Sequence, residues 1–296
     1  MSQTAELGQL PKVPSSWAFE SRSLWKTVLV LALLGLLYFR ILDRLAIQWW
    51  HDPNFSHGFF VPAFSIYVLW LKRETLRKLP LSPSWSGVLV LVVGLGFLIV
   101  GNLGAELFLS RFSLLIVIAG LVICFMGWPH QRQLLFPWLF LILMIPIPAI
   151  FFNQVTFPLQ LLASKLASGV LPLAGVPVLR EGNIIHLPAM PLEVAEACSG
   201  IRSLLTLATL AIIYGYLMES KIAIRVVLAL GSIPIAVAAN SFRIVGTGLM
   251  VQYWNPDSAE GFFHLFSGWL IFVVSLVLLF FLHKALRAFC RRRVVC

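Results

Sequence analysis

Cys198 stands where its thiol could act as a nucleophile. It directly precedes Ser199 and Gly200, at the point where an apolar run begins. Either of these two residues is a plausible N-cap, which would put the sulfur against a helix N-terminus. The partial positive charge at such an end favours the thiolate, the reactive form of cysteine. Taken alone, such a residue is more often a buried thiol that has no chemical role.

Two further residues could complete such a site. Arg243 follows Asn240 near the end of a second apolar run, and His264 lies among aromatic residues at the start of a third. An arginine at membrane depth is costly and is usually paired or functional, while histidine titrates near neutrality and suits proton transfer. The alternative for Arg243 is an ion pair with Glu196 or with lipid phosphate. The alternative for His264 is a histidine that lies at the membrane interface. Together with Cys198, the three residue types predict a nucleophilic site, with Arg202 as the second choice for the arginine.

The composition of the chain indicates the environment in which these residues lie. The 296 residues are 59% hydrophobic and 11% charged, with a mean hydropathy of +0.92. Soluble domains carry about a quarter charged residues, so an ordinary soluble fold is excluded. The 23 Phe and 10 Trp exclude a disordered chain. The net charge of +10 comes largely from Lys and Arg beside apolar runs. This pattern indicates membrane topology and contact with lipid headgroups, and we expect no nucleic-acid partner.

The apolar runs predict an all-α polytopic membrane protein with about eight transmembrane helices, each of roughly 20 residues. Pro146 and Pro148, late in the fifth run, are expected to be tolerated there. The segment 153–175 is interrupted by proline and glycine, which favours a short interfacial or re-entrant helix. The turn Glu181-Gly182-Asn183 predicts a small extracytoplasmic β element near 176–196. The expected spans are 25–42, 57–71, 86–104, 107–127, 134–152, 200–218, 222–240 and 263–283.

Clusters of Lys and Arg place both termini in the cytoplasm, with tails at 1–24 and 286–296 and a membrane domain at 25–285. In that topology Cys198 is the one cysteine on the outer side, because Cys124, Cys290 and Cys296 face inward. We therefore expect no disulfide.

At these residues the sequence resembles the exosortase family. Three blocks carry the resemblance: Glu196 to Ser203 around the cysteine, Asn240 to Ile244 around the arginine, and Phe263-His264 with Gly268. The block from Asn54 to Gly58 is a fourth point of similarity. The resemblance implies a membrane-embedded cysteine transpeptidase with Cys198, Arg243 and His264 as catalytic residues. It also implies a bacterial inner-membrane location, often encoded beside exopolysaccharide genes, with the active site facing the periplasm.

The implied substrates are exported proteins that end in a sorting signal, made of a short motif such as Pro-Glu-Pro, a transmembrane helix and a basic cluster. The enzyme would cut near the motif and transfer the protein to an unidentified acyl acceptor, with membrane lipid as its surroundings. No cofactor is expected. A zinc site from His57, His264 and Glu196 lacks any recognisable ligand spacing. Supporting or substrate-binding roles are expected for Glu196, Ser199, Gly200, Arg202, Asn240, Asn54, Ser56 and His57.

Two other functions compete with this interpretation. A transporter or assembly factor for exopolysaccharide export would place broken helices and charges near the bilayer midplane. Here the informative polar residues lie at span ends on one side, which favours surface chemistry. A glycosyl transferase would need outward acidic residues, and Asp52, Asp257 and Glu260 form no recognisable constellation.

Overall fold

The computed structural model describes residues 21–194, 200–254 and 262–292. The chain forms two compact units, residues 1–43 and 44–296. Helix α1 (Ser21–His51) lies mostly in the first unit, and every other element lies in the second. The elements before the sheet are η1 (Ser56–Phe59), α2 (Phe60–Leu71), α3 (Arg73–Lys78), α4 (Ser86–Leu103), α5 (Leu107–Phe125), α6 (Trp128–Gln133), α7 (Leu135–Phe140), η2 (Leu141–Met144), α8 (Ala149–Val170) and η3 (Leu171–Ala174). The sheet strands β1 (Leu179–Glu181), β2 (Ile184–His186) and β3 (Pro191–Glu193) precede α9 (Ile201–Met218), α10 (Ile222–Tyr253) and α11 (Phe262–Arg292).

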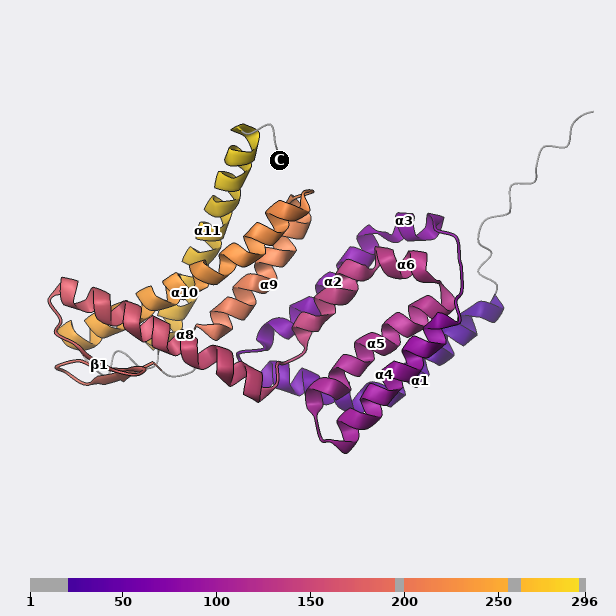
Figure 1. Ribbon diagram of the computed structural model, residues 1–296, viewed down its shortest axis with the longest axis horizontal. Helices are drawn as coiled ribbons and strands as arrows, with labels where there is room; N and C mark the ends of the chain where they lie inside the picture. Colours follow the sequence, from indigo (N-terminus) through magenta and orange to yellow (C-terminus); the bar gives the residue numbers. More distant parts are fainter. Residues whose placement is uncertain (1–20, 195–199, 255–261, 293–296) are drawn as a thin grey trace, which may run out of the picture. The chain divides into compact units, whose positions relative to one another are not determined.

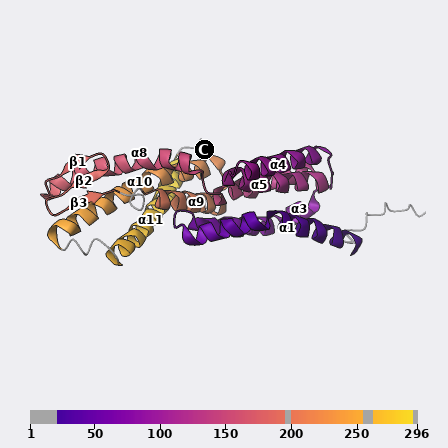
Figure 2. The same cartoon turned by 90° about the horizontal axis from the view of Figure 1, so that it is seen from below.

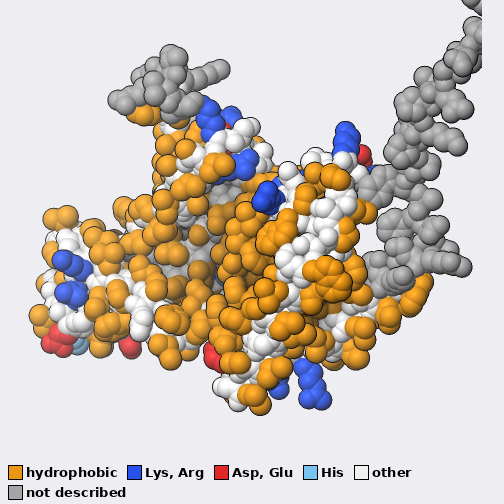
Figure 3. Space-filling view, turned by 45° about the vertical axis from the view of Figure 1, so that its right-hand side comes forward, with side chains coloured by type: hydrophobic (Ala, Val, Ile, Leu, Met, Phe, Trp, Pro, Cys, Tyr) orange, Lys and Arg blue, Asp and Glu red, His pale blue; other side chains and the backbone are white. Residues whose placement is uncertain are grey.

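Six helical segments among the described residues are long and apolar enough to cross a bilayer. Their outward side chains are apolar as well, for example Leu89, Ile150 and Leu230, which are all exposed. Figure 3 shows hydrophobic side chains over most of one face, with charged groups towards the ends of the helices. The prediction of an all-α polytopic membrane protein with a small sheet is confirmed. The six segments are 86–103, 107–125, 149–174, 201–218, 222–253 and 266–290.

The expected single span over 134–152 is wrong. The chain there forms only the short apolar stretch α7–η2 and then an extended segment before α8 begins. Ile145 and Pro148 both adopt extended ψ angles, of 118° and 140°. A residue before proline is driven out of the helical region, and proline itself has no N–H to donate. Pro146 and Pro148 therefore end one helix and start the next.

The segment expected as a short interfacial or re-entrant helix is instead part of a longer helix. Helix α8 begins at Ala149 and continues for 22 residues through Pro158, and with η3 it is long and apolar enough to span. The two views in Figures 1 and 2 show α8 running beside α10, and α4 beside α5.

Helix α10 belongs to two separate hydrophobic cores. Its first half packs with α9 and α11 through Ile224, Leu228 and Ala236. Its second half packs with α8 and the sheet through Ile244 and Val251. The predicted end of this span at residue 240 is therefore too early, because packing on α8 and the sheet extends the helix to Tyr253. The residues between the two cores include Asn240 and Arg243.

The sheet is a three-stranded antiparallel meander in the order β1-β2-β3. Glu181 pairs with Ile184, so Gly182 and Asn183 form a two-residue turn between β1 and β2. Gly182 has a φ of +63°, the left-handed conformation that such turns require and glycine adopts readily. The predicted hairpin at 181–183 is confirmed.

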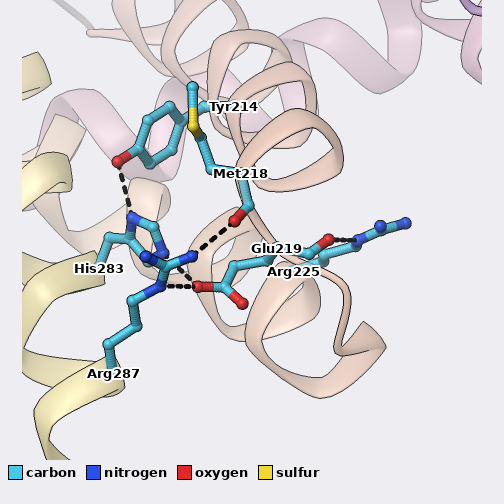
Figure 4. A network of polar contacts seen from close by, with 6 residues as sticks. All are labelled: Tyr214, Met218, Glu219, Arg225, His283 and Arg287. Atoms are coloured by element: carbon cyan, nitrogen blue, oxygen red, sulfur yellow. Dashed lines mark hydrogen bonds and ion pairs between the residues drawn. The ribbon is translucent and has the colours of Figure 1, made fainter.

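A polar network joins α9, the α9–α10 turn and α11 (Figure 4). Because a carboxylate only accepts, His283 Nε2 donates to Glu219 Oε1 at 2.6 Å, while His283 Nδ1 pairs with the Tyr214 hydroxyl at 2.7 Å. Arg287 forms an ion pair with the same carboxylate. Arg225 Nε donates to the Glu219 backbone carbonyl at 2.7 Å. The Glu219 side chain is only 8% exposed, and its carboxylate fixes α11 to the α9–α10 turn.

Glu219→Gln is expected to lower the thermal midpoint at pH 7 by roughly 5 °C, since charged hydrogen bonds contribute about 2 kcal/mol. Hydrogen bonding by His283, assisted by Arg287, holds the pKa of the Glu219 carboxyl below its usual 4.5. A depressed pKa stabilises the fold above the unfolded value, and this contribution is lost as the pH falls through the folded value. Thermal midpoints measured in detergent between pH 7 and 3 should show the higher stability of the wild type disappearing at the acidic end. An advantage independent of pH would contradict this role.

Candidate functional site

The start of α9 lies directly against α10. Gly200 is the N-cap of α9 and has a φ of +77°, a conformation that other residues rarely adopt. A Cβ at this position would lie 2.9 Å from Cγ of Asn240, so only glycine fits between the two helices. Asn240 is 4% exposed. The predicted helix start at Ser199 or Gly200 is thus confirmed at Gly200.

One turn further along α10, Arg243 lies against α11. A Cβ added at Gly268 would be 3.6 Å from Cζ of Arg243, which places the guanidinium beside the α11 backbone. Position 264 is one helical turn before Gly268 and shares its face, because residues i and i+4 align on a helix. A single turn of α10, from Asn240 to Arg243, therefore contacts both the start of α9 and the first turns of α11.

Several residues predicted for the site lie outside the described residues. These are Glu196, Cys198 and Ser199, together with the side chain of His264, whose backbone is part of α11. Arg202 is described and is exposed on the first turn of α9. Arg243 is half-buried, which distinguishes it from the second choice for the arginine role.

In the segment from Asn54 to Gly58, Phe55, His57 and Gly58 are buried, whereas Ser56 is exposed. His57 is 5% exposed, and a Cβ at Gly58 would lie 2.3 Å from Nε1 of Trp49. That indole N–H donates to the Met144 carbonyl at 2.9 Å. These contacts give the segment a structural role in joining η1 to η2. Ser56 donates only to the nearby Pro53 carbonyl, at 3.2 Å, and Asn54 lines a cavity described below.

The charges near the α10 turn that contacts both α9 and α11 favour a negatively charged group. The guanidinium of Arg243 brings a full positive charge to the turn of α10 that also contacts the N-cap of α9. The N-terminus of α9 adds the partial positive charge of the helix dipole. Such an arrangement can stabilise a thiolate or the oxyanion that forms when a carbonyl is attacked.

Gly200→Ala is expected to destabilise the protein and impair the site together. The left-handed conformation alone costs an alanine about 1–2 kcal/mol, and the contact with Asn240 adds a steric clash. We expect a thermal midpoint at least roughly 5 °C lower in detergent. Gly169→Ala is the matched control, because it lies within α8 with no atom within 4 Å of the new Cβ. Equal midpoints for both variants would show that α9 does not depend on this contact.

Sequence reasoning missed Arg111, which is 4% exposed in the second turn of α5. The available signal was an arginine inside an apolar run, which is costly in a membrane. It lies in a different cavity from the Asn240–Arg243 turn.

Comparison with curated proteins and with solved structures gives no match. The family model for the transmembrane exosortase matches residues 49–281. That range begins near the end of α1, includes the sheet and reaches into α11, so it contains the whole convergence of α9, α10 and α11. The chain therefore belongs to the transmembrane exosortase family.

Proposed function

We propose that this exosortase is a membrane-embedded cysteine transpeptidase with Cys198, Arg243 and His264 as its catalytic residues. The observation that carries the proposal is the contact of one turn of α10 with both the α9 N-cap and α11. Cys198 is two residues from Gly200, a span of about 7 Å at most. His264 is one turn from Gly268, beside which the Arg243 guanidinium lies. The closeness of Cys198 and His264 in sequence to these two contacts supports their assignment to the same site.

In the proposed reaction the Cys198 thiolate attacks the carbonyl carbon of the scissile peptide bond. Arg243 stabilises the negative charge that develops on the carbonyl oxygen. The carbon–nitrogen bond breaks, His264 donates a proton to the leaving amine, and a thioester remains on Cys198. An acceptor nucleophile then loses its proton to His264 and attacks the thioester, which releases the thiolate.

The proposed substrates are exported proteins with a C-terminal signal of a short motif, a transmembrane helix and a basic cluster. The proposed location is the bacterial inner membrane, with both termini in the cytoplasm and the site facing the periplasm. The clusters of Lys and Arg at the ends of the spans support this orientation. Glu196, Ser199 and Asn240 are proposed to orient the catalytic groups or the substrate.

The experiment is co-expression of an exported reporter that carries such a signal, with and without this protein. We expect the reporter to lose its C-terminal helix only when the protein is present, as measured by intact mass. If the mass of the reporter stays unchanged with each of several candidate motifs, the result would favour a non-enzymatic export factor. A mass that corresponds to the free acid would assign hydrolysis in place of transfer.

A further inference from the structure

A cavity of about 530 Å³ lies between the end of α1, the start of α5 and the start of α8. Its polar lining consists of Gln48, Asp52, Asn54, Glu106, Arg111 and Asn153. Neither Asn240 nor Arg243 lines it, so it is separate from the proposed catalytic turn. The termini of three helices surround it.

Arg111 is the central group of this cavity. It is 4% exposed, yet within the part of the chain that the structure describes it makes no hydrogen bond and no ion pair. Glu106 attracts the guanidinium at longer range. An unpaired buried charge is expensive, and an ionisable side chain within a membrane span usually marks a binding or transport site. The guanidinium is therefore available to an anionic group that enters the cavity.

A second positive element reaches the same cavity. The first turn of α8, a helix of 22 residues, contributes Ala149, Phe152 and Asn153 to the lining. Its N-cap Pro148 provides no side-chain hydrogen bond, so the first N–H groups of α8 are available to a ligand. Helix N-termini of this kind bind phosphate. Arg111 lies four residues inside α5, about 6 Å below its end, which is a depth that lipid phosphates reach.

Two carboxylates, those of Asp52 and Glu106, line the same cavity. Asp52 Oδ1 accepts from the Asn54 N–H at 2.9 Å, and Glu106 Oε2 accepts from the Leu109 N–H at 2.9 Å. Each carboxylate has a second oxygen that no hydrogen bond of the described residues uses. A simple anion would satisfy Arg111 but leave two acids facing it. A ligand with one phosphate and one ammonium matches both the positive and the negative groups of the cavity.

We propose that this cavity binds the headgroup of an amine-bearing phospholipid. Arg111 and the α8 N-terminus hold its phosphate, and Asp52 and Glu106 hold its ammonium. Phe108 and Phe152, which also line the cavity, contact the glycerol end of the lipid. A primary ammonium donates three hydrogen bonds to carboxylates, so the site prefers ethanolamine to choline or glycerol headgroups.

The experiment is native mass spectrometry of delipidated protein titrated with phosphatidylethanolamine, phosphatidylcholine or phosphatidylglycerol. We expect the ethanolamine lipid to bind about tenfold more tightly than the other two, and Arg111→Gln to remove that advantage. The double variant Asp52→Asn, Glu106→Gln should lose the preference for ethanolamine over glycerol while it keeps lipid binding. Arg180→Gln, an exposed arginine on β1, is the matched control and should bind as the wild type does.

Equal binding of all three lipids by the wild type, or equal binding by wild type and Arg111→Gln, would overturn the proposal. Arg111→Lys keeps the charge and provides a folded comparison if the glutamine variant unfolds. Soluble phosphoethanolamine that binds as tightly as the lipid would assign a free phosphate ester instead. Loss of reporter cleavage in Arg111→Gln with unchanged lipid binding would assign the arginine to a carboxylate of the protein substrate, and would equally overturn the lipid site.

Discussion

Replacing Cys198 by alanine is expected to abolish processing of the reporter, with a fall in rate of roughly 10⁴-fold or more. The reason is that the proposed reaction passes through a covalent thioester, and alanine offers no nucleophile. The contact of Gly200 with Asn240 remains in this variant, so the helices around the site should still assemble. The measurement is the initial rate of reporter cleavage in membranes, normalised to the amount of enzyme present.

Cys198→Ser separates the nucleophile from the shape of the side chain. Its hydroxyl is a far weaker nucleophile than a thiolate at neutral pH, so we expect it to be inactive as well. Hydroxylamine should release acylated reporter from the wild type but from neither variant. Normal cleavage by either variant, at normal membrane levels, would remove Cys198 from the mechanism while leaving the family assignment intact.

Arg243→Gln is expected to slow cleavage by about 10²–10³-fold, the usual effect of removing one donor to an oxyanion. The guanidinium lies beside Gly268, and the neutral amide of glutamine brings no charge to this position. Because the interaction strengthens in the transition state, the loss should appear in kcat more than in KM. Arg243→Lys retains the charge without the planar fork and should be intermediate.

Arg202→Gln is the matched control for this experiment, since it removes an exposed arginine one turn into α9. We expect this variant to retain most of the wild-type rate. The opposite result, with Arg202→Gln inactive and Arg243→Gln active, would transfer the arginine role to Arg202. If both variants kept their activity, charge stabilisation by arginine would not be part of catalysis.

Local signals in the sequence were sufficient where the structure is local. The turn at Gly182 and the start of α9 at Gly200 both depend on a glycine with positive φ beside a change of hydrophobic pattern. The family could be predicted for a similar reason, since its blocks are short runs of consecutive residues. Whether Cys198 and His264 act as those blocks imply stays a prediction.

The parts that the sequence could not reveal depend on distant packing. Asn240 and Arg243 resembled the end of a span because they are polar, yet α8 and the sheet continue the helix beyond them. The pair Pro146 and Pro148 was visible, but whether prolines are tolerated in a membrane helix depends on its neighbours. The cavity around Arg111 is formed by segments near residues 50, 106 and 150, so no single stretch of sequence could predict it.

The length of α10 has a consequence for where the proposed chemistry occurs. Its 32 residues measure about 48 Å along the axis, whereas the hydrocarbon layer of a bilayer is only about 30 Å thick. If α10 enters the hydrocarbon at Ile222, about 20 residues bring it to the opposite boundary, and this distance ends beside Asn240 and Arg243. The second half of α10, with the sheet packed on it, then stands in the headgroup layer and the water beyond. The thickness of the bilayer thus sets the depth of the Arg243 guanidinium. That depth in turn determines which peptide bond of a membrane-anchored substrate this arginine can reach.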